Sequence, residues 1–254
     1  MIVSTGLRIA AAAGLGAVSG LFGGLFGIGG GVLAIPLLGM LYGLHQQAAQ
    51  GTTLLMVVPN VLFGFWRYHR RVGLDIRIAA TLGLTALISA YPVARLTTGL
   101  DPHALRLAFA AFLAVLAALI GWRTWNRGAA PARRAPLGWG WTALVGISGG
   151  VVSGLFGVGG AFITPPLLTA FFGVRQIEAQ GLALALVCPG TVVSLVVYAE
   201  AGQVEWGVGI PLALGGIAAI SSGVALAQRL PERRLRLGFC GLLIVTAVLL
   251  AVHG

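Results

Sequence analysis

Charge is scarce in this sequence, and what there is belongs mostly to one sign. Only 9% of the 254 residues are charged, six of them are acids, and all 16 basic residues are arginine. By contrast, 58% of the residues are hydrophobic. A water-soluble fold cannot enclose that much apolar surface. The composition therefore excludes a soluble domain and predicts a polytopic membrane protein.

The residue patterns of common catalytic and metal sites are missing as well. Cys188 and Cys240 lie far apart in apolar runs, and the sequence has no CxxC motif or Cys/His ligand spacing. It also lacks an HExxH motif, and no Lys-Ser/Thr pair follows its glycine-rich stretches, which excludes a phosphate-binding P-loop. We therefore expect no metal site, no cofactor and no enzymatic activity.

What the sequence does contain is an internal repeat. The stretch 24–38 returns at 154–168 with nine of fifteen positions identical, an offset of 130 residues. The offset continues without a gap, so that Gln50 matches Gln180 and Pro59 matches Pro189. We accordingly divide the chain into a first transmembrane repeat at 1–126, a cytoplasmic linker at 127–136 and a second transmembrane repeat at 137–254.

Each half contains five apolar segments, which predict an all-α fold. The segments are 7–26, 32–44, 47–66, 78–96 and 104–122, then 137–156, 162–173, 178–199, 206–227 and 237–252. Most approach the roughly 20 residues that cross a bilayer as a helix. Segments 32–44 and 162–173 reach only about 20 Å at 1.5 Å per residue, against a hydrocarbon core of about 30 Å. We predict that these two are half-helices.

The arginine clusters predict that the two halves have inverted topology. Loop 67–77 carries four arginines and its repeat partner 197–207 carries none, whereas loop 229–236 carries four and its partner 99–106 is nearly neutral. Because arginine-rich loops stay in the cytoplasm, matched loops should lie on opposite sides of the membrane, with both termini outside. The same clusters explain the net charge of +10 without a nucleic-acid partner.

A glycine break precedes each predicted half-helix. Gly29-Gly30-Gly31 and the matching Gly159-Gly160-Ala161 are poor helix interiors, and we expect unwound turns there. The half-helices that follow would begin with free N–H groups and a positive dipole end, which attract anions. In inverted halves the two breaks would converge near the midplane as a binding site. The glycines spaced by four that come before each break (Gly16, Gly20 and Gly24; Gly146, Gly150 and Gly154) instead indicate close helix packing.

Polar residues inside the apolar segments complete the candidate site. Gln50 and Gln180 are paired by the repeat, and we include both. Thr52 and Thr53 have hydroxyls that either bind oxyanion oxygens or bond back to their own helix. For Asn60, Ser19 and Ser153 we favour a packing role. We interpret Tyr68 and Tyr198 as anchors at the two membrane interfaces.

The sequence resembles the TauE/SafE family of sulfite and organosulfonate exporters. The residues that carry the resemblance are Phe26 to Gly31 with Pro36 and Leu37, then Gly51-Thr52-Thr53 and Gly73-Leu74-Asp75. The resemblance implies transport of sulfite, sulfoacetate or a related anion across a bacterial or archaeal plasma membrane. Ala161 and Gly181-Leu182-Ala183 depart from the family pattern, so we expect an asymmetric site with hydroxyls mainly from the first half.

These observations lead to a functional hypothesis with two alternatives. The hypothesis is a multi-pass secondary transporter of the plasma (inner) membrane that exports a small sulfur-containing anion by alternating access, with protons as the candidate coupling ion. A passive anion channel is the first alternative, and a membrane enzyme of sulfur metabolism is the second. The glycine spacing fits internal packing and a dimer face equally, which leaves the oligomeric state open.

Overall fold

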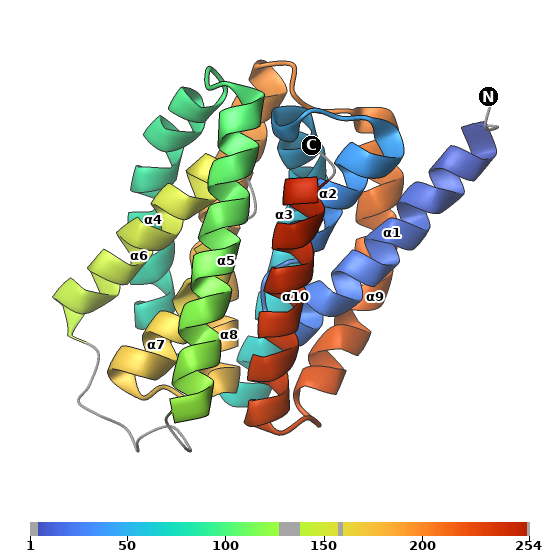
Figure 1. Ribbon diagram of the computed structural model, residues 1–254. Coiled ribbons are helices and arrows are strands. Elements are labelled where there is room, and N and C mark those ends of the chain that lie inside the picture. Colours follow the sequence, from blue (N-terminus) through green and yellow to red (C-terminus); the bar gives the residue numbers. More distant parts are fainter. Residues whose placement is uncertain (1–4, 127–137, 157–159, 253–254) are drawn as a thin grey trace.

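The chain forms a bundle of helices (Figure 1). The computed structural model describes residues 5–126, 138–156 and 160–252, which contain no strand. The helices are α1 (Thr5–Phe26), α2 (Gly31–Tyr42), α3 (Gln46–Val72), α4 (Ile76–Thr97), α5 (Pro102–Asn126), α6 (Trp139–Phe156), a short 3₁₀ helix η1 (Gly160–Phe162), α7 (Thr164–Phe172), α8 (Gln176–Glu200), α9 (Trp206–Ala227) and α10 (Glu232–Val252). The all-α prediction is confirmed. The predicted linker 127–136 lies outside the described residues, and the division of the chain into two repeats stays a prediction.

Six of the described helices have the length and composition to cross a membrane. The candidate spans lie in α1, α3, α4, α5, α8 and α9. Helix α2 has only 12 residues and α7 only nine, which agrees with the two predicted short segments. At 1.5 Å per residue, α2 extends about 18 Å and cannot cross the hydrocarbon core alone. The structure is therefore that of a polytopic membrane protein with a short helix near the start of each half.

Most arginines of the clusters in 67–77 and 229–236 lie on helices, which differs from the loops we predicted. Helix α3 continues through Arg67, Arg70 and Arg71, so the connection to α4 spans only 73–75 instead of 67–77. Arginine is a good helix former, and the helix ends only at Gly73, where the backbone turns left-handed with φ of 67°. The cluster in 229–236 similarly runs into α10, which begins at Glu232.

The strongest packing joins helices from different halves of the sequence. Helix α1 packs on α9 and α4 packs on α6, at the two flanks of the bundle, while α3 meets α8 in the centre and α5 meets α10 (Figure 1). At both flanks a glycine face lies against backbone. The faces are Gly16, Gly20 and Gly24 on Leu212, Gly216 and Ile220, and Gly146, Gly150 and Gly154 on Leu82, Ala86 and Ala90. The predicted packing role of these six glycines is confirmed.

These contacts repeat at the same offset as the sequence. Residues 212, 216 and 220 are each 130 positions after 82, 86 and 90. The contact of α1 with α9 therefore involves the same repeat positions as the contact of α6 with α4, with the two halves exchanged. In Figure 1 the short helices α2 and α7 lie toward opposite ends of the bundle. Helix α1 begins and α10 ends near the same end, and α5 ends at the other. The side of the membrane that each end faces stays a prediction.

Candidate functional site

The first glycine break is a buried turn between α1 and α2. After α1 ends at Phe26, Gly29 and Gly30 adopt positive φ of 72° and 95°, and α2 starts at Gly31. Residues with a Cβ rarely adopt such angles. No side chain caps the start of α2. The first turn of α2 therefore presents amide groups without a capping side chain, at the helix end that favours negative charge.

Asn60 of α3 holds this turn in place. Its Nδ2 donates to the carbonyl oxygen of Gly29 at 3.2 Å, and its side chain is fully buried. Gly30 packs so closely on Ser19 of α1 that a Cβ would collide with the Ser19 backbone oxygen. Our sequence interpretation assigned Asn60 and Ser19 to packing, but Asn60 contacts the break directly. The signal that pointed to this role was an amide inside an apolar span.

Helix α3 carries a buried polar stripe that ends at the break. Gln50, Thr53 and Asn60 follow one another at spacings of three and seven, which places them on one face of the helix. All three are fully buried. In the described part of the chain, Gln50 Nε2, Thr53 Oγ1 and Asn60 Oδ1 have no hydrogen-bond partner. Buried polar atoms inside a membrane span are costly without a partner, so this α3 polar stripe indicates a functional surface.

Thr52, the neighbour of Thr53, has a structural contact. Its Oγ1 accepts a hydrogen bond of 2.9 Å from the backbone N–H of Glu205, the residue that precedes α9. The two threonines thus differ: Thr52 holds the start of a helix from the second half, and Thr53 keeps an unpartnered hydroxyl. Thr52 therefore has a structural contact as an acceptor, whereas the Thr53 hydroxyl has neither a donor nor an acceptor partner among the described residues.

Two tyrosine–glutamine pairs join the halves at the crossing of α3 and α8. Tyr198 Oη donates to Gln50 Oε1 at 2.7 Å. Tyr68 Oη lies 3.1 Å from both Gln180 Oε1 and the Gly24 carbonyl oxygen, which share its single hydrogen. Each pair is converted into the other by the 130-residue offset. Both tyrosines are fully buried, so the interpretation of Tyr68 and Tyr198 as interface anchors was wrong. Their hydroxyls satisfy buried amide oxygens inside the bundle instead of facing lipid headgroups.

Removing one of these hydroxyls should cost stability. In Tyr198→Phe the buried Gln50 Oε1 loses its donor, and we expect a loss of about 1–2 kcal/mol, the usual cost of an unsatisfied buried group. The measurement is the apparent midpoint of thermal unfolding in detergent. Tyr91→Phe is the matched control because Tyr91 is 47% exposed. Equal midpoints for the two variants would contradict a structural role for the pair.

The second glycine break differs from the first. Gly160 and Ala161 are described and buried, and Gly159 lies outside the described residues. Here the chain forms the 3₁₀ helix η1, and α7 follows with Pro165 and Pro166 in its first turn. Proline has no N–H group, so this helix start offers fewer donors to an anion than that of α2. The convergence of the two breaks near the midplane stays a prediction.

The second half has no polar side chain at the positions that match Thr53 and Asn60, although α8 contains one buried hydroxyl without a partner among the described residues, that of Ser194. The positions that match Thr53 and Asn60 are Ala183 and Gly190. Gln180 has both ends of its amide occupied, since it accepts from Tyr68 and its Nε2 donates to the Leu25 oxygen at 3.4 Å. The unpartnered polar atoms of the stripe therefore belong to the first half, in line with the asymmetry that the sequence suggested.

The comparisons with known proteins cover nearly the whole chain. The family model described as sulfite exporter TauE/SafE matches residues 12–250. A probable membrane transporter protein of Xylella fastidiosa is 30% identical over 250 residues, covering 94% of this chain and 92% of the relative. A probable membrane transporter protein of Methanocaldococcus jannaschii is 25% identical over 239 residues, with 88% of each chain covered. No solved structure matches the chain significantly.

Proposed function

Because the chain belongs to the TauE/SafE sulfite exporter family and is a multi-pass membrane transporter, we propose that it exports small sulfur-containing anions by secondary transport. The proposed substrates are sulfite or organosulfonates such as sulfoacetate. The proposed location is the inner membrane, with both termini outside and protons as the candidate coupling ion.

The α3 polar stripe beside the uncapped start of α2 is the observation that carries this proposal. An oxyanion needs several hydrogen-bond donors at once, and a helix N-terminus supplies them without a buried cation. Gln50 Nε2 and Thr53 Oγ1 are donors without a partner among the described residues, and both lie inside the membrane span α3. We place the transported anion at the Asn60 end of this stripe, against the Gly29–Gly31 turn. Thr53 and Gln50, about 10 and 15 Å further along α3, are the next donors on its path.

The charge distribution supports an anionic substrate. Every acidic side chain whose exposure is described lies at a helix end or in a connection, and none is buried. The two ion pairs that the structure shows in the described chain, Arg95–Glu200 at 3.2 Å and Arg175–Glu178 at 2.5 Å, also lie at helix ends. A negative substrate inside the bundle would therefore meet no carboxylate among these described acidic side chains.

The helix–helix contacts suggest which groups of helices would move against each other during alternating access. The glycine-lined contacts bind α1 to α9 and α4 to α6, and α3 and α8 pack on α9 and α4 respectively. The moving bodies in our proposal are thus two mixed groups, α1–α3–α9 and α4–α6–α8, instead of the two sequence halves. They meet where α3 crosses α8, next to the tyrosine–glutamine pairs.

Flux measured in proteoliposomes tests the proposal. We expect saturable uptake of radiolabelled sulfite or of a labelled sulfonate, with a rate that responds to an imposed pH gradient. A labelled amino acid without a sulfonate group is the control substrate. Flux that rises linearly with concentration would favour the passive channel, and no flux of either label from folded, inserted protein would overturn the substrate class.

A further inference from the structure

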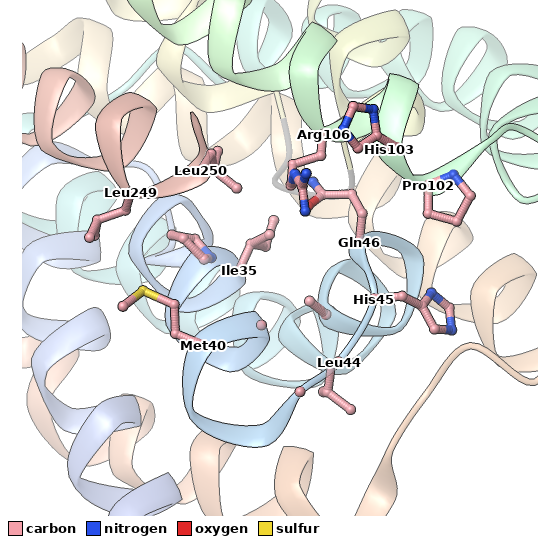
Figure 2. A pocket seen from close by; sticks show the side chains of 14 residues that line it. Ile35, Met40, Leu44, His45, Gln46, Pro102, His103, Arg106, Leu249 and Leu250 are labelled. Carbon is pink, nitrogen blue, oxygen red and sulfur yellow. The ribbon is translucent and has the colours of Figure 1, made fainter. Parts of the chain in front are cut away.

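A pocket opens at the end of the bundle where α2 ends and α3 and α5 begin (Figure 2). Its volume is about 320 Å³, enough for a small oxyanion with its water. Its polar lining consists of Arg106, Gln46, His45 and His103, and none of its fourteen lining residues is acidic. The apolar part of the lining includes Ile35 and Pro36 of α2, about one turn from the glycine break.

Two donors in this pocket have no acceptor. Figure 2 shows the side chains of Gln46 and Arg106 extending toward one another. Gln46 is 6% exposed, and both its Nε2 and the Nε of Arg106 are buried without a hydrogen-bond partner in the described structure. Two N–H donors that border one pocket cannot satisfy each other, whereas a negatively charged oxygen can accept from both and is held most firmly by the guanidinium.

The repeat-related pair of residues shows how an arginine and a glutamine at these positions can hydrogen-bond to each other. Arg106 and Gln46 correspond to Arg236 and Gln176 at the offset of 130. There, Arg236 Nε donates to Gln176 Oε1 at 3.3 Å. The same two side-chain types thus bond to each other at the second site and border a pocket at the first.

The pocket also lies in line with the α3 polar stripe. Gln46 precedes Gln50 by four residues and Thr53 by seven, so all three share one face of α3. The unpartnered donors Gln46 Nε2, Gln50 Nε2 and Thr53 Oγ1 follow one another from the pocket toward the break. The row extends from Gln46 to Asn60, which is about 21 Å of helix at 1.5 Å per residue. This is more than half of the roughly 30 Å thickness of the hydrocarbon core.

We infer that Arg106 and Gln46 form a second anion-binding site, a vestibule at the outer end of the transport path. Its ligand is a small oxyanion, sulfite or a sulfonate. The identity of this anion as the transported substrate rests on the proposed function, whereas anion binding in the vestibule does not. Under the predicted topology the vestibule faces the outside, where an exporter releases its substrate.

Charge-selective labelling of a cysteine in the pocket tests the inference without any transport. Cys188 and Cys240 are first replaced by Ser, and Met40, which lines the pocket and is 39% exposed, is replaced by Cys. The reaction rates of an anionic sulfonatoethyl thiosulfonate and its cationic trimethylammonium analogue are each divided by the rate of the neutral methyl reagent. This division removes changes in pocket shape from the comparison.

We expect the anionic-to-cationic ratio to fall about tenfold in Arg106→Gln, because a charge inside a confined pocket raises the local concentration of counter-ions. Arg106→Lys should keep most of the ratio. The matched control is Arg95→Gln, which removes the same charge near the same end of the bundle from a residue outside the pocket. Gln46→Leu, which keeps the charge, should lower the protection of this cysteine by added sulfoacetate, a sulfonate that, unlike sulfite, does not react with the thiosulfonate reagents.

An unchanged ratio in Arg106→Gln, or an equal fall in Arg95→Gln, would overturn the vestibule. The second result would mean that the whole end of the bundle, and not a built site, attracts anions. Either result leaves the proteoliposome flux untouched, so the vestibule and the proposed transport can fail independently. Charge-selective labelling in a protein that moves neither sulfite nor sulfonate would support the vestibule while removing its assigned role in their export.

Discussion

Gly30→Ala is expected to lower sulfite or sulfonate flux by at least tenfold while most of the protein still inserts into the membrane. Gly30 has φ of 95°, and a side chain there costs about 1–2 kcal/mol in backbone strain. A Cβ at this position also collides with the backbone oxygen of Ser19, which a rotamer change cannot relieve. The turn must shift, and with it the start of α2 and the hydrogen bond from Asn60 to the Gly29 oxygen.

Gly73→Ala is the control that separates the effect of backbone strain from the effect of a collision at the glycine break. Gly73 also has positive φ, 67°, but a Cβ there meets no atom within 4 Å. We expect this control to lose stability by a similar strain energy and to keep its flux. The measurement is initial flux per folded, inserted protein in proteoliposomes, with insertion quantified separately. If both variants lose flux equally, the effect comes from general destabilisation and the break is not part of the site.

Gly20→Leu should prevent the bundle from assembling, the largest effect on folding that we expect. Gly20 of α1 lies directly against the backbone of Gly216 in α9, so a larger side chain forces the two helices apart. Membrane helices associate through such close packing because no hydrophobic effect drives them together in lipid. Separating them therefore removes the packing along a whole flank, and we expect little monodisperse protein after size-exclusion chromatography in detergent.

Gly14→Leu is the matched control on the same helix, because a Cβ at Gly14 meets no atom within 4 Å. The second flank provides an independent repetition, with Gly150→Leu predicted to behave like Gly20→Leu and Gly140→Leu like Gly14→Leu. Normal assembly of both Gly20→Leu and Gly150→Leu would show that the two glycine faces are not needed to hold the flanks together.

Sequence interpretation was wrong in two places, for two different physical reasons. The arginines at 67–71 were predicted to lie in a loop because they are charged, but helix α3 continues past the apolar run until Gly73 ends it. Tyr68 and Tyr198 lie near the ends of apolar segments and were interpreted as interface anchors, yet both are buried. An amphipathic side chain near a membrane boundary faces lipid or protein according to its neighbours, which local sequence does not specify.

The sequence by itself determined the membrane class, the repeat, the helical segments and the two short helices after the glycine breaks. These features depend on composition and on local spacing. Apolar runs, glycine and proline determine the secondary structure of the few residues around them. Only the tertiary structure decided that Asn60 holds the Gly29 turn, that Tyr198 meets Gln50, and that Arg106 lies beside Gln46. The two residues of each pair are 31, 148 and 60 positions apart, and whether they meet depends on how whole helices pack and rotate.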